Sequence, residues 1–208
     1  MRILILACLW LLSPLAAAGP EEDFDSAVAV FQKARAGAGS ATDEAVARFE
    51  RLATTATPYA PLFLAYLGAA QALQARDAWM PWSKMRAAER GLANIDKALR
   101  RLDAGHDALL LRQSPVAAET RLVAATTFVA LPALFNRLDD AKTTLRAALA
   151  SPAYAAAPGA LRAQLHWQAA LVAARDRKTA EEIEQLKKAA AADPSNPSAR
   201  QRLQEIGS

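Results

Sequence analysis

The stretch EIEQLKKAAAADP, residues 182–194, carries a helix pattern that recurs along the chain. Leu186 stands four residues after Glu182, Ala189 follows three residues later, and Pro194 comes five residues after that alanine. Residues spaced by four and three lie on one face of an α-helix, and a proline cannot continue the helix. The stretch therefore predicts an amphipathic helix that buries one narrow face and ends before Pro194.

Three earlier stretches repeat this spacing, each with a small residue in the first position. They read Ala45-Phe49-Leu52, Gly91-Ile95-Ala98 and Ala141-Leu145-Ala148. A small residue lets a partner helix approach closely, and the large residue after it fills the gap between neighbouring pairs. Because a single helix hairpin cannot bury both of its faces, such hairpins are expected to stack.

The composition also favours an all-α protein. The 208 residues include 53 Ala, but after residue 18 only seven Val and three Ile, which are too few β-branched residues for a sheet protein. The single Cys excludes an intrachain disulfide and a Cys-based zinc site, and two His argue against a His-built metal site or a Ser/His hydrolase. No phosphate loop, metal-binding helix motif or nucleophile elbow is found, so no catalytic residue and no cofactor are expected.

Prolines, glycines and capping residues divide residues 19–208 into about nine helices of one domain. Thr42 is expected to cap the second helix, and Thr179 with Glu182 to form a capping box for the eighth. Residues 151–158 are expected to form a loose connection. The predicted helices start near residues 21, 42, 58, 83, 115, 136, 159, 179 and 198.

The repeated pairs resemble the tetratricopeptide repeat (TPR). The offset from Ala189 to Pro194 and the dipeptide Leu67-Gly68 match positions of that family, although the copies here start at residues 45, 91, 141 and 182, wider than the family period of about 34 residues. Residues 121–148 are also similar to helical proteins of the bacterial envelope. The resemblance implies a right-handed stack of antiparallel helix hairpins, a TPR-like α-solenoid. The alternative is an unrelated helical bundle with Ala-rich seams.

In a stack of this kind, the first helices of the pairs line a groove that binds peptides or partner proteins. The helices near 58–76, 115–131 and 159–175 would take this position. Polar or large residues beside their apolar stripes are the candidate groove contacts: Tyr66, Gln71, Arg121, Thr126, Gln164, His166 and Gln168.

The segment DAWMPWSKM, residues 77–85, is the most unusual part of the chain. It combines Trp79, Met80, Trp82 and Met85 in an expected surface connection. Aromatic and Met side chains adapt to irregular partners, so the segment is a candidate patch for a partner or an apolar ligand. The alternative is a loop whose Trp rings plug the groove between helix pairs.

A Met/His copper site built from Met80, Met85 and His106 is conceivable on ligand type alone, although nothing in the sequence fixes its geometry. Residues 76–101 hold seven basic and three acidic residues. A basic face beside two Trp could meet an anionic lipid surface or an acidic partner. The alternative is an ordinary solvated helix face, and the modest net charge argues against nucleic acid.

The first eighteen residues have the form of a signal peptide. Arg2 is followed by an apolar run and by Ala16-Ala17-Ala18, which predicts cleavage before Gly19. The run is shorter than the ~20 residues that span a bilayer, which argues against an uncleaved anchor. Cys8 lies inside the run, too early for a lipidated Cys. The mature chain is therefore expected in the periplasm or secreted.

Two functions follow from these observations. The first is an exported helical-repeat scaffold or adaptor that binds a protein or peptide partner in the periplasm. The alternative is a periplasmic carrier of an apolar small molecule, such as a lipid or sterol, in a cavity between helices. Six aromatic residues could line that cavity: Phe63, Trp79, Trp82, Phe128, Phe135 and Trp167.

Overall fold

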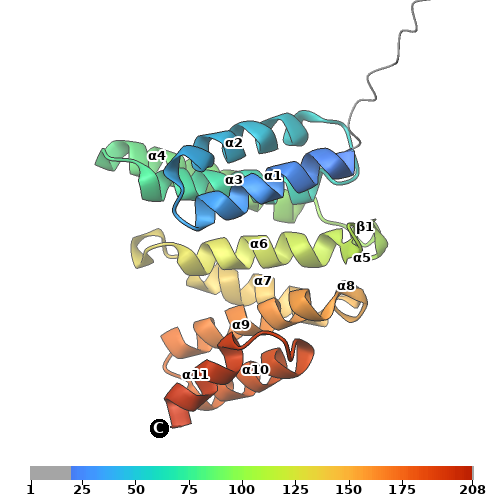
Figure 1. Cartoon of the computed structure of the whole chain (residues 1–208), viewed down its shortest axis with the longest axis vertical. Coiled ribbons are helices and arrows are strands. Elements are labelled where there is room, and N and C mark those ends of the chain that lie inside the picture. The colour runs from blue at the N-terminus through green and yellow to red at the C-terminus, as the bar shows by residue number, and fades with distance from the viewer. Residues whose placement is uncertain (1–19, 208) are drawn as a thin grey trace, which may run out of the picture.

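The computed structural model describes residues 20–207, and helices form most of this part of the chain. They lie across the long axis of the molecule and follow one another in chain order, from α1 and α2 to α10 and α11 (Figure 1). The all-α prediction is confirmed. The elements are α1 (Pro20–Arg35), α2 (Gly39–Thr54), α3 (Ala60–Asp77), α4 (Pro81–Arg100), α5 (Gly105–Ala108), β1 (Leu110–Leu111), β2 (Ser114–Pro115), α6 (Val116–Ala130), η1 (Ala133–Phe135), α7 (Leu138–Ala150), α8 (Pro152–Ala156), α9 (Gly159–Arg175), α10 (Thr179–Ala192) and α11 (Ser198–Gly207).

The predictions for the N-terminus concern residues that the structure does not describe. The signal peptide over residues 1–18, the position of Cys8 and the cleavage before Gly19 all lie outside the described residues. Between residues 20 and 207, no helix is long and apolar enough to cross a membrane.

All nine predicted helices occur, and the short elements between them were not predicted. Residues 151–158 were expected to be a loose connection, which is wrong, because α8 forms there. Its start is well defined: Pro152 occupies the first turn, and the Ser151 hydroxyl accepts a hydrogen bond from the backbone N–H of Ala153 at 3.2 Å.

Two predicted helix starts and one predicted capping box are corrected. α2 begins at Gly39, so Thr42 is not its cap; its buried hydroxyl donates instead to Asp77 Oδ2 at 2.7 Å. The capping box at the start of α10 is absent, because Glu182 is buried and accepts a hydrogen bond from Arg202. α7 begins at Leu138, and the expected start, Asn136, has a left-handed φ of 50° that ends η1.

The repeated positions fall on the second helix of each pair and are all buried. They lie on α2, α4, α7 and α10, which pack against α1, α3, α6 and α9. The twelve buried positions are Ala45, Phe49, Leu52, Gly91, Ile95, Ala98, Ala141, Leu145, Ala148, Glu182, Leu186 and Ala189. The four-and-three pattern therefore identifies the face that each of these helices buries.

The helices α3 and α4 approach each other closely. A Cβ placed on Gly91 would stand 2.6 Å from the backbone oxygen of Gly68, and a Cβ on Gly68 would stand 2.5 Å from the backbone oxygen of Gly91. Neither position has space for a side chain. The small residue of the repeat thus sets the distance between the two helices.

Candidate functional site

An apolar groove of about 580 Å³ opens where α3, α4 and α6 meet. Its walls come from the C-terminal parts of α3 and α6, the first two turns of α4, the end of α1 and the turn through η1. The volume is within the range of sites for small molecules. Most lining side chains are apolar: Phe31, Ala69, Ala72, Leu73, Ala75, Pro81, Met85, Ala88, Ala130, Leu131, Pro132, Leu134 and Phe135.

The sequence creates this groove through small residues and one proline. Alanines at positions 69, 72 and 75 of α3 face the groove and leave it open, because they contribute only methyl groups. At the other wall, α6 ends before Leu131-Pro132, and η1 brings Leu134 and Phe135 to the groove. Proline cannot extend α6, since it lacks the N–H that the helix needs.

A polar cluster holds the helices together at the edge of the groove. Arg76 lines the groove and donates to the backbone oxygen of Ala34 at 2.9 Å, and it pairs with Asp77 at 2.6 Å. The hydrogen bond from Arg76 holds the pKa of Asp77 below its ordinary value. Asp77 also accepts the hydroxyl of Thr42, so α1, α2 and α3 are linked at this end.

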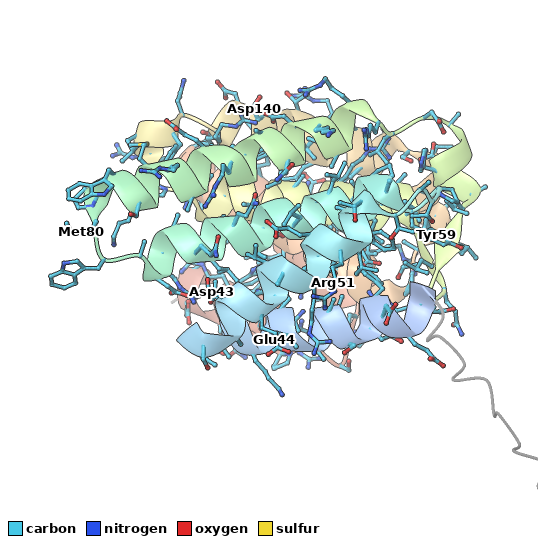
Figure 2. All side chains as sticks on the ribbon, turned by 90° about the horizontal axis from the view of Figure 1, so that it is seen from above. Asp43, Glu44, Arg51, Tyr59, Met80 and Asp140 are labelled. Carbon is cyan, nitrogen blue, oxygen red and sulfur yellow. The ribbon has the colours of Figure 1, made fainter. Side chains whose placement is uncertain are left out.

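The tryptophans of the 77–85 segment stand beside this groove and are open to solvent. Trp79 is 90% exposed and Trp82 58% exposed, so the alternative in which their rings plug a gap between helix pairs is wrong. Figure 2 shows Met80 at the outer tip of the turn between α3 and α4. α4 already begins at Pro81, which places Trp82 and Met85 on a helix, with Met85 lining the groove.

The other candidate groove residues are not gathered on one surface. Thr126 lines the same groove as Met85. Tyr66 is buried and donates to Glu119 Oε1 at 2.7 Å, and buried Gln71 accepts a hydrogen bond from Asn94 at 2.8 Å. These two side chains therefore join neighbouring helices.

The remaining candidates lie in or beside the C-terminal half. Arg121 pairs with Asp107 at 3.3 Å, and Gln168 is buried on α9. Gln164 lines a small pocket of about 120 Å³ between α9 and α11. His166 is buried and lines an open pocket of about 600 Å³, where its ring nitrogens contact Tyr154 and Gln185.

Of the aromatic residues considered for a carrier cavity, one lines the apolar groove. Phe135 lies in its wall, whereas Phe63 and Phe128 are buried among core residues. Trp167 borders the small pocket beside α11. Any apolar ligand in this groove would therefore contact Phe135, Phe31 and aliphatic side chains.

The proposed Met/His copper ligands do not meet. His106 Nε2 lies 3.2 Å from the backbone oxygen of Pro58, just before α3, whereas Met80 follows the end of α3. An 18-residue helix is about 27 Å long, so these groups are at opposite ends of the hairpin. Within the described part of the chain, no group of three His, Cys, Asp or Glu residues is placed to hold a metal ion.

Sequence reasoning missed an ion pair between the buried Glu119 and the half-buried Arg112. Arg112 donates to Glu119 Oε1 at 2.9 Å, and the same oxygen accepts from the Tyr66 hydroxyl. Arg112 lies in the turn between β1 and β2, where its backbone has a left-handed φ of 50°. Its side chain therefore reaches Glu119 from a loop and not from a helix. Glu119 is an acidic residue within the mostly apolar sequence of α6, and this feature could have indicated a basic partner in the core.

Comparison of the chain with family models, curated proteins and solved structures yields no match. The groove and the exposed Trp segment therefore provide the basis for assigning a function.

Proposed function

We propose that the chain is an exported helical-repeat adaptor, in which stacked TPR-like hairpins present a groove to a protein or peptide partner in the periplasm. The observation that carries this proposal is the apolar groove between α3 and α6, the first helices of two successive pairs. Its open apolar surface fits a few large side chains of a bound polypeptide, and the signal-peptide pattern of residues 1–18 supports the periplasmic location.

A second candidate is a carrier of an apolar small molecule. The groove volume of about 580 Å³ and its apolar lining favour this function, since such pockets bury most of a ligand of that size. The basic side chains Arg35, Arg76 and Lys84 lie in the same lining and suit a ligand with one anionic end.

The test fills the groove with one large side chain. Ala130 lines the groove at the exposed end of α6, so Ala130→Trp should block it without disturbing the core. Ala147→Trp is the matched control, because Ala147 is exposed on α7 and does not line the groove. Each chain is purified from its own cell envelope and analysed by native mass spectrometry, with a photo-crosslinking residue at position 134 in the groove wall.

A polypeptide that crosslinks from position 134 and is lost only in Ala130→Trp supports the adaptor. A stoichiometric small adduct with the same dependence supports the carrier and rejects the adaptor. Equal binding by both variants would place the binding site elsewhere.

A further inference from the structure

The solvent-facing side of α4 is strongly basic. Arg86, Arg90, Lys97 and Arg100 lie on one exposed face of the helix, and Arg101 follows directly after it. We call these five residues the basic face of α4. Among the residues that the structure describes, none of the five has an acidic partner within ion-pair distance.

Acidic residues do little to neutralise this face. Glu89 is the carboxylate that shares it, and Asp96 beside it pairs with Arg137. On the far side of α3 from α4, Figure 2 shows both acidic and basic residues on α2, among them Asp43, Glu44 and Arg51, and Glu44 pairs with Arg48. The basic face of α4 therefore carries a local excess of positive charge.

Exposed aromatic side chains continue this face at its end. Trp82 lies on the same side of α4, one turn before Arg86, and Trp79 precedes it in the exposed turn. The indole ring combines an apolar body with a polar N–H, and this places Trp at the boundary between lipid headgroups and acyl chains. Leu134, which is 68% exposed, adds apolar area on the neighbouring turn.

This combination fits a bilayer better than a folded partner. From Arg86 to Arg101 the cations extend about 22 Å along a straight helix, as 15 residues at about 1.5 Å each. They form an exposed row, with the aromatic residues at one end. A planar layer of anionic lipid headgroups can contact every cation of such a row, while the two indole rings insert into the membrane interface beside it.

We propose that Trp79, Trp82 and the basic face of α4 dock the chain on an anionic lipid bilayer. This inference is separate from the proposed function, because it does not depend on what occupies the groove. Docking through this surface would leave the mouth of the groove near the membrane, since Met85 and Lys84 of α4 belong to its lining.

The test measures co-sedimentation of the full chain with vesicles of phosphatidylglycerol in phosphatidylcholine and with phosphatidylcholine alone. Binding is expected to the anionic vesicles and should be lost near 1 M salt, where the Debye length is about 3 Å. The variant Arg86→Gln, Arg90→Gln, Lys97→Gln should weaken binding by about fivefold per cation, or about a hundredfold together. Trp79→Ala with Trp82→Ala should weaken it by at least about tenfold.

A matched control removes the same charge elsewhere. Arg51, Lys187 and Arg200 are exposed on α2, α10 and α11, and replacing all three by Gln gives the same net charge as the α4 variant. The control should bind vesicles like the parent chain. All variants carry the same N-terminal residues, so differences between them report on the replaced positions alone, and far-UV circular dichroism checks that they fold.

Three outcomes would overturn the proposal. The first is a parent chain that shows no preference for anionic vesicles. The second is an equal loss of binding by the two charge variants, which would indicate a general charge effect. The third outcome is unchanged vesicle binding by the Trp79→Ala, Trp82→Ala variant together with loss of a copurified polypeptide, which would assign the patch to a protein partner.

Discussion

Each half of the described chain contains a buried polar cluster, and the two clusters are formed by different kinds of side chain. In the N-terminal half, the ion pair Arg112–Glu119 meets the hydroxyl of Tyr66. In the C-terminal half, the His166 ring lies between the hydroxyl of Tyr154 at 2.8 Å and the side chain of Gln185 at 2.7 Å. The N-terminal cluster contains an ion pair, whereas all hydrogen bonds of the C-terminal cluster can form between neutral groups.

The surroundings of the two clusters differ in the same way. Tyr66 stacks on Phe49 with ring centroids 5.1 Å apart, and Arg112 lies 4.5 Å above the ring of Phe24. The C-terminal helices are joined mainly by small or single aliphatic residues, such as Ala170 and Leu186. A buried charge needs close partners, and large rings add packing area around them. The N-terminal half should therefore lose more stability when one side chain is truncated.

The largest effect is expected for Phe49→Ala. Phe49 is fully buried and contacts three other rings, so its removal should cost about 3–5 kcal/mol of unfolding free energy. The equivalent repeat position in the last pair is Leu186, and Leu186→Ala should cost less, near the lower end of about 2–5 kcal/mol. Urea unfolding followed by circular dichroism measures both values.

The exposed Leu134 supplies the control for this pair, since Leu134→Ala should change the free energy of unfolding by less than about 0.5 kcal/mol. A larger loss for Leu186→Ala than for Phe49→Ala would show that the C-terminal half is the more tightly coupled one.

A smaller effect is expected where α3 and α4 touch. Gly91→Ala places a methyl group against the backbone oxygen of Gly68, and the two helices must separate to accept it. Overpacking of this kind costs about 1–3 kcal/mol. Gly39→Ala is the control, because Gly39 lies in α2 with no atom within 4 Å of the added carbon, and it should be neutral or stabilising. Equal stability of the two variants in urea would refute the close approach.

Much of the fold could be predicted from the sequence because it depends on local spacing. The four-and-three pattern of small and large residues identified a buried face on α2, α4, α7 and α10. Prolines marked the ends of α6 and α10 within a few residues. These signals act within one or two helical turns, so one sequence is enough to read them.

The parts that could not be predicted depend on residues far apart in the chain. Thr42 has the sequence signature of a cap, but its hydroxyl bonds Asp77, which is 35 residues away. Tyr66 and Glu119 meet across 53 residues, so Tyr66 was assigned to a groove although it lies in the core. The site was predicted in part for the same reason: Met85 and Thr126 line one groove, but they meet because α4 and α3 both pack against α6.

The smallest expected effect is the loss of stability that acidic pH causes through the C-terminal cluster. Burial lowers the pKa of His166 below its ordinary value of 6.5; the bond to Gln185 opposes this shift, and Lys188 and Arg162 add to it. The neutral ring satisfies both partners, because Nδ1–H donates to Gln185 and Nε2 accepts the hydroxyl of Tyr154. Protonation turns Nε2 into a donor and forces that hydroxyl to reorient.

The sign of the pH effect follows from linkage. Between the lowered pKa of the folded state and 6.5, the unfolded chain binds a proton that the folded chain does not bind. The stability supplied by neutral His166 is therefore complete above pH 6.5 and falls as the pH drops toward the folded-state pKa. Urea unfolding at a series of pH values, compared between the parent chain and His166→Gln, isolates this contribution. If the two chains lost stability in parallel below pH 6.5, the loss would belong to other groups and the C-terminal cluster would not respond to acid.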